Sequence, residues 1–157
     1  MIPIGQTCKG PLTLLLLLAV CGCGGQDATG PEPNPTANPD FMVGSWLATS
    51  MLLTSKANPE VAVDLIQLGA TFTLSVEPSG RYLAILEGYG QSSSESGRLT
   101  VEGPLVIFMR SLPTPDESSA QWERNGTSVT LEGDSEFDFN SDLTPEEATL
   151  RTVLVPQ

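Results

Sequence analysis

The sequence predicts an all-β fold, an antiparallel up-and-down β-barrel of eight or nine strands, with a β-sandwich as the alternative. Residues 70–77 alternate apolar and polar side chains with a period of two, which is typical of a strand with one buried face. In residues 149–155 a strand would place Leu150, Thr152 and Leu154 on one face and Arg151 and Val153 on the other. Turn sequences recur at short intervals, and Pro-Ser-Gly at 78–80 and Asn-Gly at 125–126 are the clearest. All three cysteines lie within the first 23 residues, so the folded part has no disulfides. A closed barrel suits such a chain because it leaves no free sheet edge.

Nine strands are expected from this pattern. The first covers residues 43–54, and residues 81–87 return from the turn at 78–80 to pair with 70–77. Residues 89–97 and 112–119 are rich in Gly, Ser, Pro or acids and are expected to form loops. The remaining strands are expected at 98–102, 105–110, 121–124, 127–132, 136–140 and 149–155.

Residues 59–67 interrupt the strand pattern and are expected to form a short helix in the first connection. Asn58 would cap this helix, Pro59 suits its first turn, and Glu60 lies where the helix dipole favours an acid. Apolar residues at 61, 65 and 68 keep helical spacing. A strand at 61–63 is the alternative.

Residues 1–23 are predicted to be a secretory signal. Lys9 precedes a Leu-rich apolar run at 12–20, which is too short to span a bilayer, and small residues and cysteines follow. The sequence Val-Cys-Gly-Cys at 20–23 resembles the bacterial lipobox, in which the final Cys is acylated. The resemblance implies membrane attachment through lipid on Cys23, with Cys21 as the alternative, since two or more acyl chains anchor stably. Gly24 replaces the Asp associated with inner-membrane retention, so we expect the outer membrane, facing periplasm or surface.

Residues 24–40 are predicted to be a disordered tether, because they contain four prolines and no large apolar residue. The barrel domain is then expected to cover residues 41–157.

The sequence excludes several functions for this domain. The full chain contains no histidine, which rules out Ser-His-Asp and Cys-His catalytic sites and histidine zinc sites, and the net charge of the full chain, −12, opposes nucleic-acid binding. We therefore expect a protein that is not an enzyme and has no cofactor.

Gly44-Ser45-Trp46 at the start of the first strand, followed by a β-meander, resembles the lipocalin-like domains of small bacterial lipoproteins. The resemblance implies that Trp46 packs across the closed end of a barrel and that a small apolar ligand binds inside. The rival interpretation is a filled barrel that acts as a cell-envelope interaction or scaffold module, with unknown protein partners. A carrier requires some small inward residues, for which Ala48, Ser50, Ala84 and Gly133 are candidates. The residues expected to line the barrel are Trp46, Phe72, Leu74, Val76, Leu99, Val101, Phe108 and Trp122.

Residues 132–147 form the most acidic stretch of the chain and contain no basic residue. Within it, the spacing of Asp138, Asn140, Asp142 and Glu146 partly matches a calcium-loop pattern. Leu143 stands where the pattern needs glycine, and Thr149 stands where it needs the bidentate glutamate. We interpret the stretch as a solvated acidic turn without a metal, and a divalent-cation site is the alternative.

Overall fold

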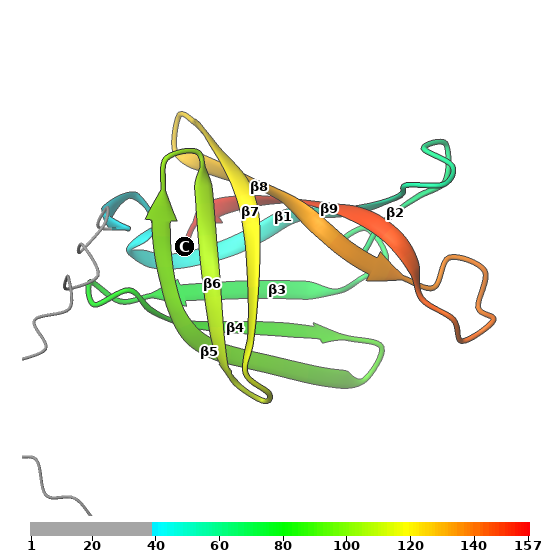
Figure 1. Ribbon diagram of the computed structural model, residues 1–157, viewed down its shortest axis with the longest axis horizontal. Helices are drawn as coiled ribbons and strands as arrows, with labels where there is room; N and C mark the ends of the chain where they lie inside the picture. The colour runs from blue at the N-terminus through cyan, green and yellow to red at the C-terminus, as the bar shows by residue number, and fades with distance from the viewer. Residues whose placement is uncertain (1–38) are drawn as a thin grey trace, which may run out of the picture. The chain divides into compact units, whose positions relative to one another are not determined.

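A computed structural model of the protein describes residues 39–157, which form one antiparallel sheet closed into a barrel (Figure 1). The strand order is β2-β1-β3-β4-β5-β6-β7-β8-β9, and an additional pairing of β1 with β9 closes the sheet. The predicted all-β barrel is therefore confirmed. The elements are η1 (Asp40–Met42), β1 (Gly44–Ser55), β2 (Ala62–Asp64), β3 (Thr71–Val76), β4 (Arg81–Gly88), β5 (Gln91–Glu102), β6 (Leu105–Leu112), β7 (Asp116–Asn125), β8 (Ser128–Phe137) and β9 (Glu146–Pro156).

Strand β1 holds the barrel together because it pairs with three other strands. One edge of β1 pairs with β9 from Trp46 to Ser55, with one register shift between Ala48 and Ser50. The other edge pairs with β3 only from Gly44 to Leu47, and with β2 from Leu52 to Thr54. The short strand β2 therefore pairs with this edge of β1 farther along, where β3 no longer does.

Asp64 fills the gap between these two pairings. Its carboxylate accepts hydrogen bonds from the Ser50 hydroxyl at 2.7 Å and from the backbone N–H groups of Met51 and Ile66 at 3.1 and 3.0 Å. Burial tends to raise the pKa of Asp64, but these hydrogen bonds favour the ionised form and hold the pKa below its ordinary value. The carboxylate thus replaces backbone partners that a neighbouring strand would have supplied.

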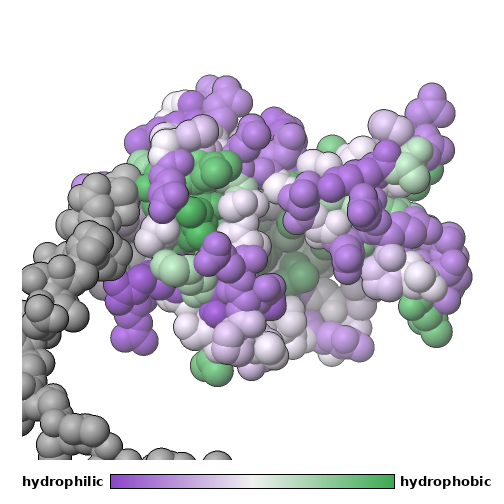
Figure 2. All heavy atoms as spheres, viewed as in Figure 1, coloured by the Kyte–Doolittle hydropathy of each residue, from purple (hydrophilic) through white to green (hydrophobic). Residues whose placement is uncertain are grey.

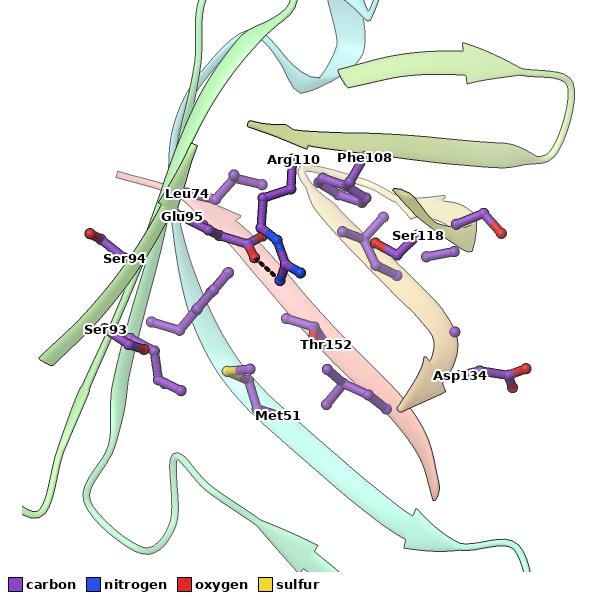
Figure 3. Close-up of a pocket in the computed structure, with 18 of the residues that line it drawn as sticks. Met51, Leu74, Ser93, Ser94, Glu95, Phe108, Arg110, Ser118, Asp134 and Thr152 are labelled. Atoms are coloured by element: carbon purple, nitrogen blue, oxygen red, sulfur yellow. Dashed lines mark hydrogen bonds and ion pairs between the residues drawn. The ribbon is translucent and has the colours of Figure 1, made fainter. Parts of the chain in front are cut away.

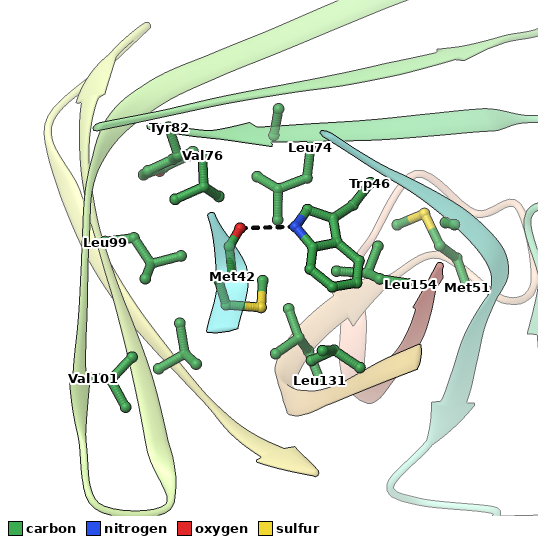
Figure 4. Packing of buried hydrophobic residues seen from close by; sticks show 14 residues of the cluster. Met42, Trp46, Met51, Leu74, Val76, Tyr82, Leu99, Val101, Leu131 and Leu154 are labelled. Carbon is green, nitrogen blue, oxygen red and sulfur yellow. Dashed lines mark hydrogen bonds between the residues drawn. The ribbon is translucent and has the colours of Figure 1, made fainter. Parts of the chain in front are cut away.

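The interior of the barrel is filled around Met42 and Trp46 (Figure 4). Met42 is fully buried, and its carbonyl accepts a hydrogen bond of 2.7 Å from the Trp46 indole N–H. Around them pack inward residues from the surrounding strands, all 5% exposed or less: Val76, Tyr82, Leu99, Val101, Val106, Val129 and Leu154. Since η1 carries Met42 into this cluster, one end of the barrel is closed by the chain's own side chains.

The helix predicted at residues 59–67 is wrong. The structure has β2 at Ala62–Asp64 and turns on both sides of it, which agrees with the strand alternative at 61–63. Two of the residues with helical spacing, Val61 and Leu68, are 39% and 55% exposed, so no helical face is buried. Pairing with β1 and the Asp64 hydrogen bonds outweigh the capping signals.

The loops predicted at 89–97 and 112–119 are also largely strand. Strand β5 begins at Gln91 and pairs with β4 through a run of exposed serines, and β7 begins at Asp116. Residues 136–140 are not a separate strand, because β8 continues to Phe137 and β9 begins at Glu146. Backbone pairing with a neighbouring strand decides the structure here and overrides local composition.

The predicted signal sequence, with Cys21 and Cys23, and most of the predicted tether lie outside the described residues. Pro39 is buried and Asp40 begins η1, so these two residues are part of the barrel domain. Within residues 39–157, no helix combines the length and apolar character needed to cross a membrane.

Replacing Trp46 with Ala is expected to lower the free energy of unfolding by about 3–5 kcal/mol, because it removes a buried ring and leaves the Met42 carbonyl unpaired. Urea unfolding of the full chain measures this loss. Trp122→Ala is the control, since Trp122 is only half-buried, and we expect it to cost less. A loss below about 1 kcal/mol for Trp46→Ala, far under the range for buried aromatic residues, would contradict the described packing.

Candidate functional site

The part of the barrel that Met42 and Trp46 do not fill contains a cavity of about 400 Å³ (Figure 3). Its apolar wall is formed by residues from strands around the whole barrel: Met51, Phe72, Leu74, Ala84, Leu86, Phe108, Ala120, Leu131 and Leu150. Ala84 and Gly133, two of the predicted small inward residues, line the cavity. Their small size leaves space that larger side chains would fill.

The cavity is bounded on one side by the place where β7 and β8 separate. These strands pair only between Ala120–Asn125 and Ser128–Gly133, and beyond this point β7 pairs only with β6 and β8 only with β9. Figure 1 shows the two strands diverging, and Figure 2 shows hydrophobic atoms set back between hydrophilic ones on this face. Lining residues from the separated segments, Ser118, Ser119 and Asp134, are exposed. The barrel therefore opens to solvent through its wall.

Arg110 is the positively charged side chain among the residues that line the cavity. Its Nε donates to the Thr114 carbonyl at 2.9 Å, and its Nη2 forms an ion pair of 2.7 Å with Asp116. A longer contact of 3.5 Å joins Nη1 to Glu95, which also lines the cavity. The Arg110 and Glu95 side chains are 31% and 39% exposed, so the pair is partly shielded from water.

Tyr82 connects this polar group to the buried core. Its ring is 3% exposed and packs edge-on against Phe108 with 5.4 Å between the ring centroids, and its hydroxyl donates to Glu95 at 3.4 Å. Burial, and secondly the neighbouring Glu95 charge, raise the pKa of Tyr82 to about 12. The phenol therefore stays neutral and keeps its proton on the side facing Glu95.

Gly97 allows β5 and β6 to approach closely where the polar group lies. It is the pairing partner of Arg110, next to a register shift between Ser96 and Gly97. A Cβ atom at this position would overlap the Met109 carbonyl oxygen and the backbone of Arg110. Glu95 lies two residues before Gly97 on β5, so the alternation of side chains along the strand places Glu95 and Arg110 on the same inner face.

Three of the residues predicted to line the barrel, Phe72, Leu74 and Phe108, border the cavity. Four others lie in the filled cluster around Met42: Trp46, Val76, Leu99 and Val101. Trp122 is half-buried and stacks on Phe41 with ring centroids 4.0 Å apart, and its indole N–H donates to the Gly103 carbonyl at 3.1 Å. The structure therefore divides the predicted set between the cavity and the closed end.

Sequence reasoning missed Glu95 and Arg110. Glu95 lies in a segment predicted to be a loop, and Arg110 is the last residue of the strand predicted at 105–110, an apolar run that does not alternate. A period-two continuation from Val106 through Phe108 would have placed Arg110 inside. No comparable pattern marks Glu95 as an inward residue, because its neighbours in β5 are mostly serines.

The acidic loop after β8 uses its side chains to hold its own backbone. Asp138 accepts hydrogen bonds from the N–H groups of Asp142 and Leu143 at 3.2 and 2.8 Å, and Asn140 donates to Glu146 at 2.9 Å. A hydrogen bond from the Thr144 N–H holds the pKa of Asp142 below its ordinary value. Within residues 39–157, no group of three or more His, Cys, Asp or Glu side chains is arranged to hold a metal ion.

Comparison with known proteins gave no further indication of function. No protein-family model matches the chain, and no curated protein matches it. The function is therefore inferred from the geometry of the barrel.

The raised pKa of Tyr82 can be measured directly, because the chain has only two tyrosines. In a Tyr89→Phe variant, the ultraviolet absorbance of phenolate is expected to rise with a midpoint near 12 instead of the ordinary 10.0. Folding stability should decline over that same interval, because the unfolded chain loses this proton first. The same variant in concentrated urea is the control, and its midpoint should return to the ordinary value. A midpoint near 10.0 in the folded protein would show that the hydroxyl is not buried beside Glu95.

Proposed function

We propose that this protein binds a small, mainly apolar molecule inside its barrel and is not an enzyme. The observation that carries the proposal is the cavity of about 400 Å³, which lies within the size range of ligand sites. Its lining is also of the expected kind, since hydrophobic and aromatic side chains form most of the wall and polar groups such as Glu95 and Arg110 interrupt it. A barrel built only for interaction through its surface does not need this space.

The volume limits the size of the ligand. At roughly 30 Å³ for each non-hydrogen atom, the share of liquid volume that one water molecule takes, the cavity holds about 13 such atoms. A hydrocarbon chain of about ten carbons with a polar end fits this limit, whereas a complete phospholipid does not. The opening between β7 and β8 would leave part of a longer molecule in solvent.

The proposal includes attachment to the bacterial cell envelope through lipid on Cys23, with the barrel facing the periplasm or the surface. The lipobox-like sequence at 20–23 and the Pro-rich segment after it support this part. Attachment would hold the barrel near a source of apolar molecules, which is where such a binding protein is useful.

Native mass spectrometry of the full chain from its producing cells is expected to show a bound molecule that is lost on denaturation. In an Ala84→Leu variant this molecule should be absent, because the larger side chain occupies the cavity. Ala62→Leu adds the same atoms to exposed strand β2 and is the matched control. Equal retention by wild type and Ala84→Leu, or a bare mass even after incubation with envelope lipids, would contradict binding in the cavity.

Changing Cys23 to Ser is expected to move the protein from the membrane fraction to the soluble fraction of its own cells, because the acylated sulfur is lost. Immunoblotting of the two fractions measures the change, and Cys8→Ser is the control. If the Cys23→Ser protein stayed with the membrane, Cys23 would not be the anchor, and Cys21 would be tested next.

A further inference from the structure

We propose that the cavity selects an apolar chain that ends in a hydroxyl group over the same chain ending in a carboxylate. This inference rests on the proposed function and names the class of ligand. It is carried by Glu95 and Arg110, which lie on adjacent strands and both line the cavity (Figure 3).

The charge of Arg110 is already balanced. Its ion pair with Asp116 at 2.7 Å and its contact with Glu95 at 3.5 Å place two carboxylates against one guanidinium. A ligand carboxylate beside Arg110 would add a third negative charge in a partly shielded site, where like charges repel more strongly than in water. Arg110 therefore does not provide an unpaired positive charge for an anionic ligand.

Both side chains nevertheless have unused hydrogen-bonding capacity. Within residues 39–157, the oxygens of Glu95 accept two long contacts, from the Tyr82 hydroxyl at 3.4 Å and from Arg110 Nη1 at 3.5 Å. A carboxylate has about four acceptor positions and a guanidinium five N–H donors, so each can make a further bond. In the same part of the chain, Arg110 Nη1 makes one hydrogen bond, the long contact with Glu95.

A hydroxyl group matches this pair because it donates and accepts at once. It can donate its proton to Glu95 and accept an N–H from Arg110. A carboxylate has no proton for Glu95 and is repelled by it.

The test compares 1-decanol and decanoate by calorimetric titration of the full chain, made without membranes so that no acyl group is attached. At neutral pH we expect decanol to bind at least about tenfold more tightly than decanoate, because the carboxylate is repelled at the site. Any apolar cavity favours an uncharged chain to some degree, so the decisive variant is Glu95→Gln. It should lower the preference for decanol over decanoate about tenfold, because one negative charge at the site is removed.

Glu117→Gln is the matched control, since Glu117 lies exposed on β7 and does not line the cavity, and it should leave the preference unchanged. Equal or tighter binding of decanoate by the wild type, or the same preference in both Gln variants, would overturn the inference but leave the proposed function standing. Binding of neither ligand would overturn both.

A structure of the decanol complex gives a second test that does not depend on the folding of a variant. The ligand oxygen should lie within hydrogen-bonding distance of both Glu95 and Arg110. A ligand oxygen placed elsewhere, with the chain still inside the cavity, would overturn the inference about the hydroxyl group.

Discussion

The unequal pairing of β1 determines the rest of the structure. Along one edge β1 pairs with β9 for almost its whole length, and this contact closes the barrel. Along the other edge it leaves β3 after Leu47, and Asp64 and β2 supply the partners that the strand then lacks. The same strand carries Trp46 at the closed end and Met51 in the wall of the cavity, so both parts of the interior depend on its position.

The two parts of the interior have different physical roles. Around Met42 the side chains are almost completely buried, and tight packing there supplies apolar contacts that stabilise the fold. Around Leu86 and Leu150 the wall is apolar but encloses space, and such space costs stability unless something fills it. A protein can maintain such a cavity when another part of its core is well packed, which is the arrangement found here.

The sequence predicted the barrel because period-two alternation is strong wherever one face of a strand is buried. Strands β3, β4 and β9 agree with their predicted ranges to within a few residues for this reason. The prediction failed where strands are formed of polar residues, as in β5, because the pairing that orders Ser92 and Ser93 comes from β4 and leaves no local pattern. The prediction of a short helix at residues 59–67 was wrong for a related reason. Hydrogen bonds from β1 hold Asp64 in place, whereas the capping residues act only on their immediate neighbours.

For the site, the sequence analysis found Phe72, Leu74 and Phe108 but missed the ion pair. Pairing between neighbouring strands, and not spacing along the chain, brings Glu95 and Arg110 together.

The opening between β7 and β8 also explains why the chain is most acidic near it. At Gly133 the two strands are so close that a Cβ atom would lie 2.7 Å from the Ser119 carbonyl oxygen, and beyond this crossing they separate. Each separated segment is a free sheet edge, which in other proteins recruits a further strand or aggregates. Here one edge carries Asp116 and Glu117, and the other carries Asp134 and Glu136. Charged side chains on an edge oppose the addition of a further strand, so these acidic residues protect the two edges where β7 and β8 separate.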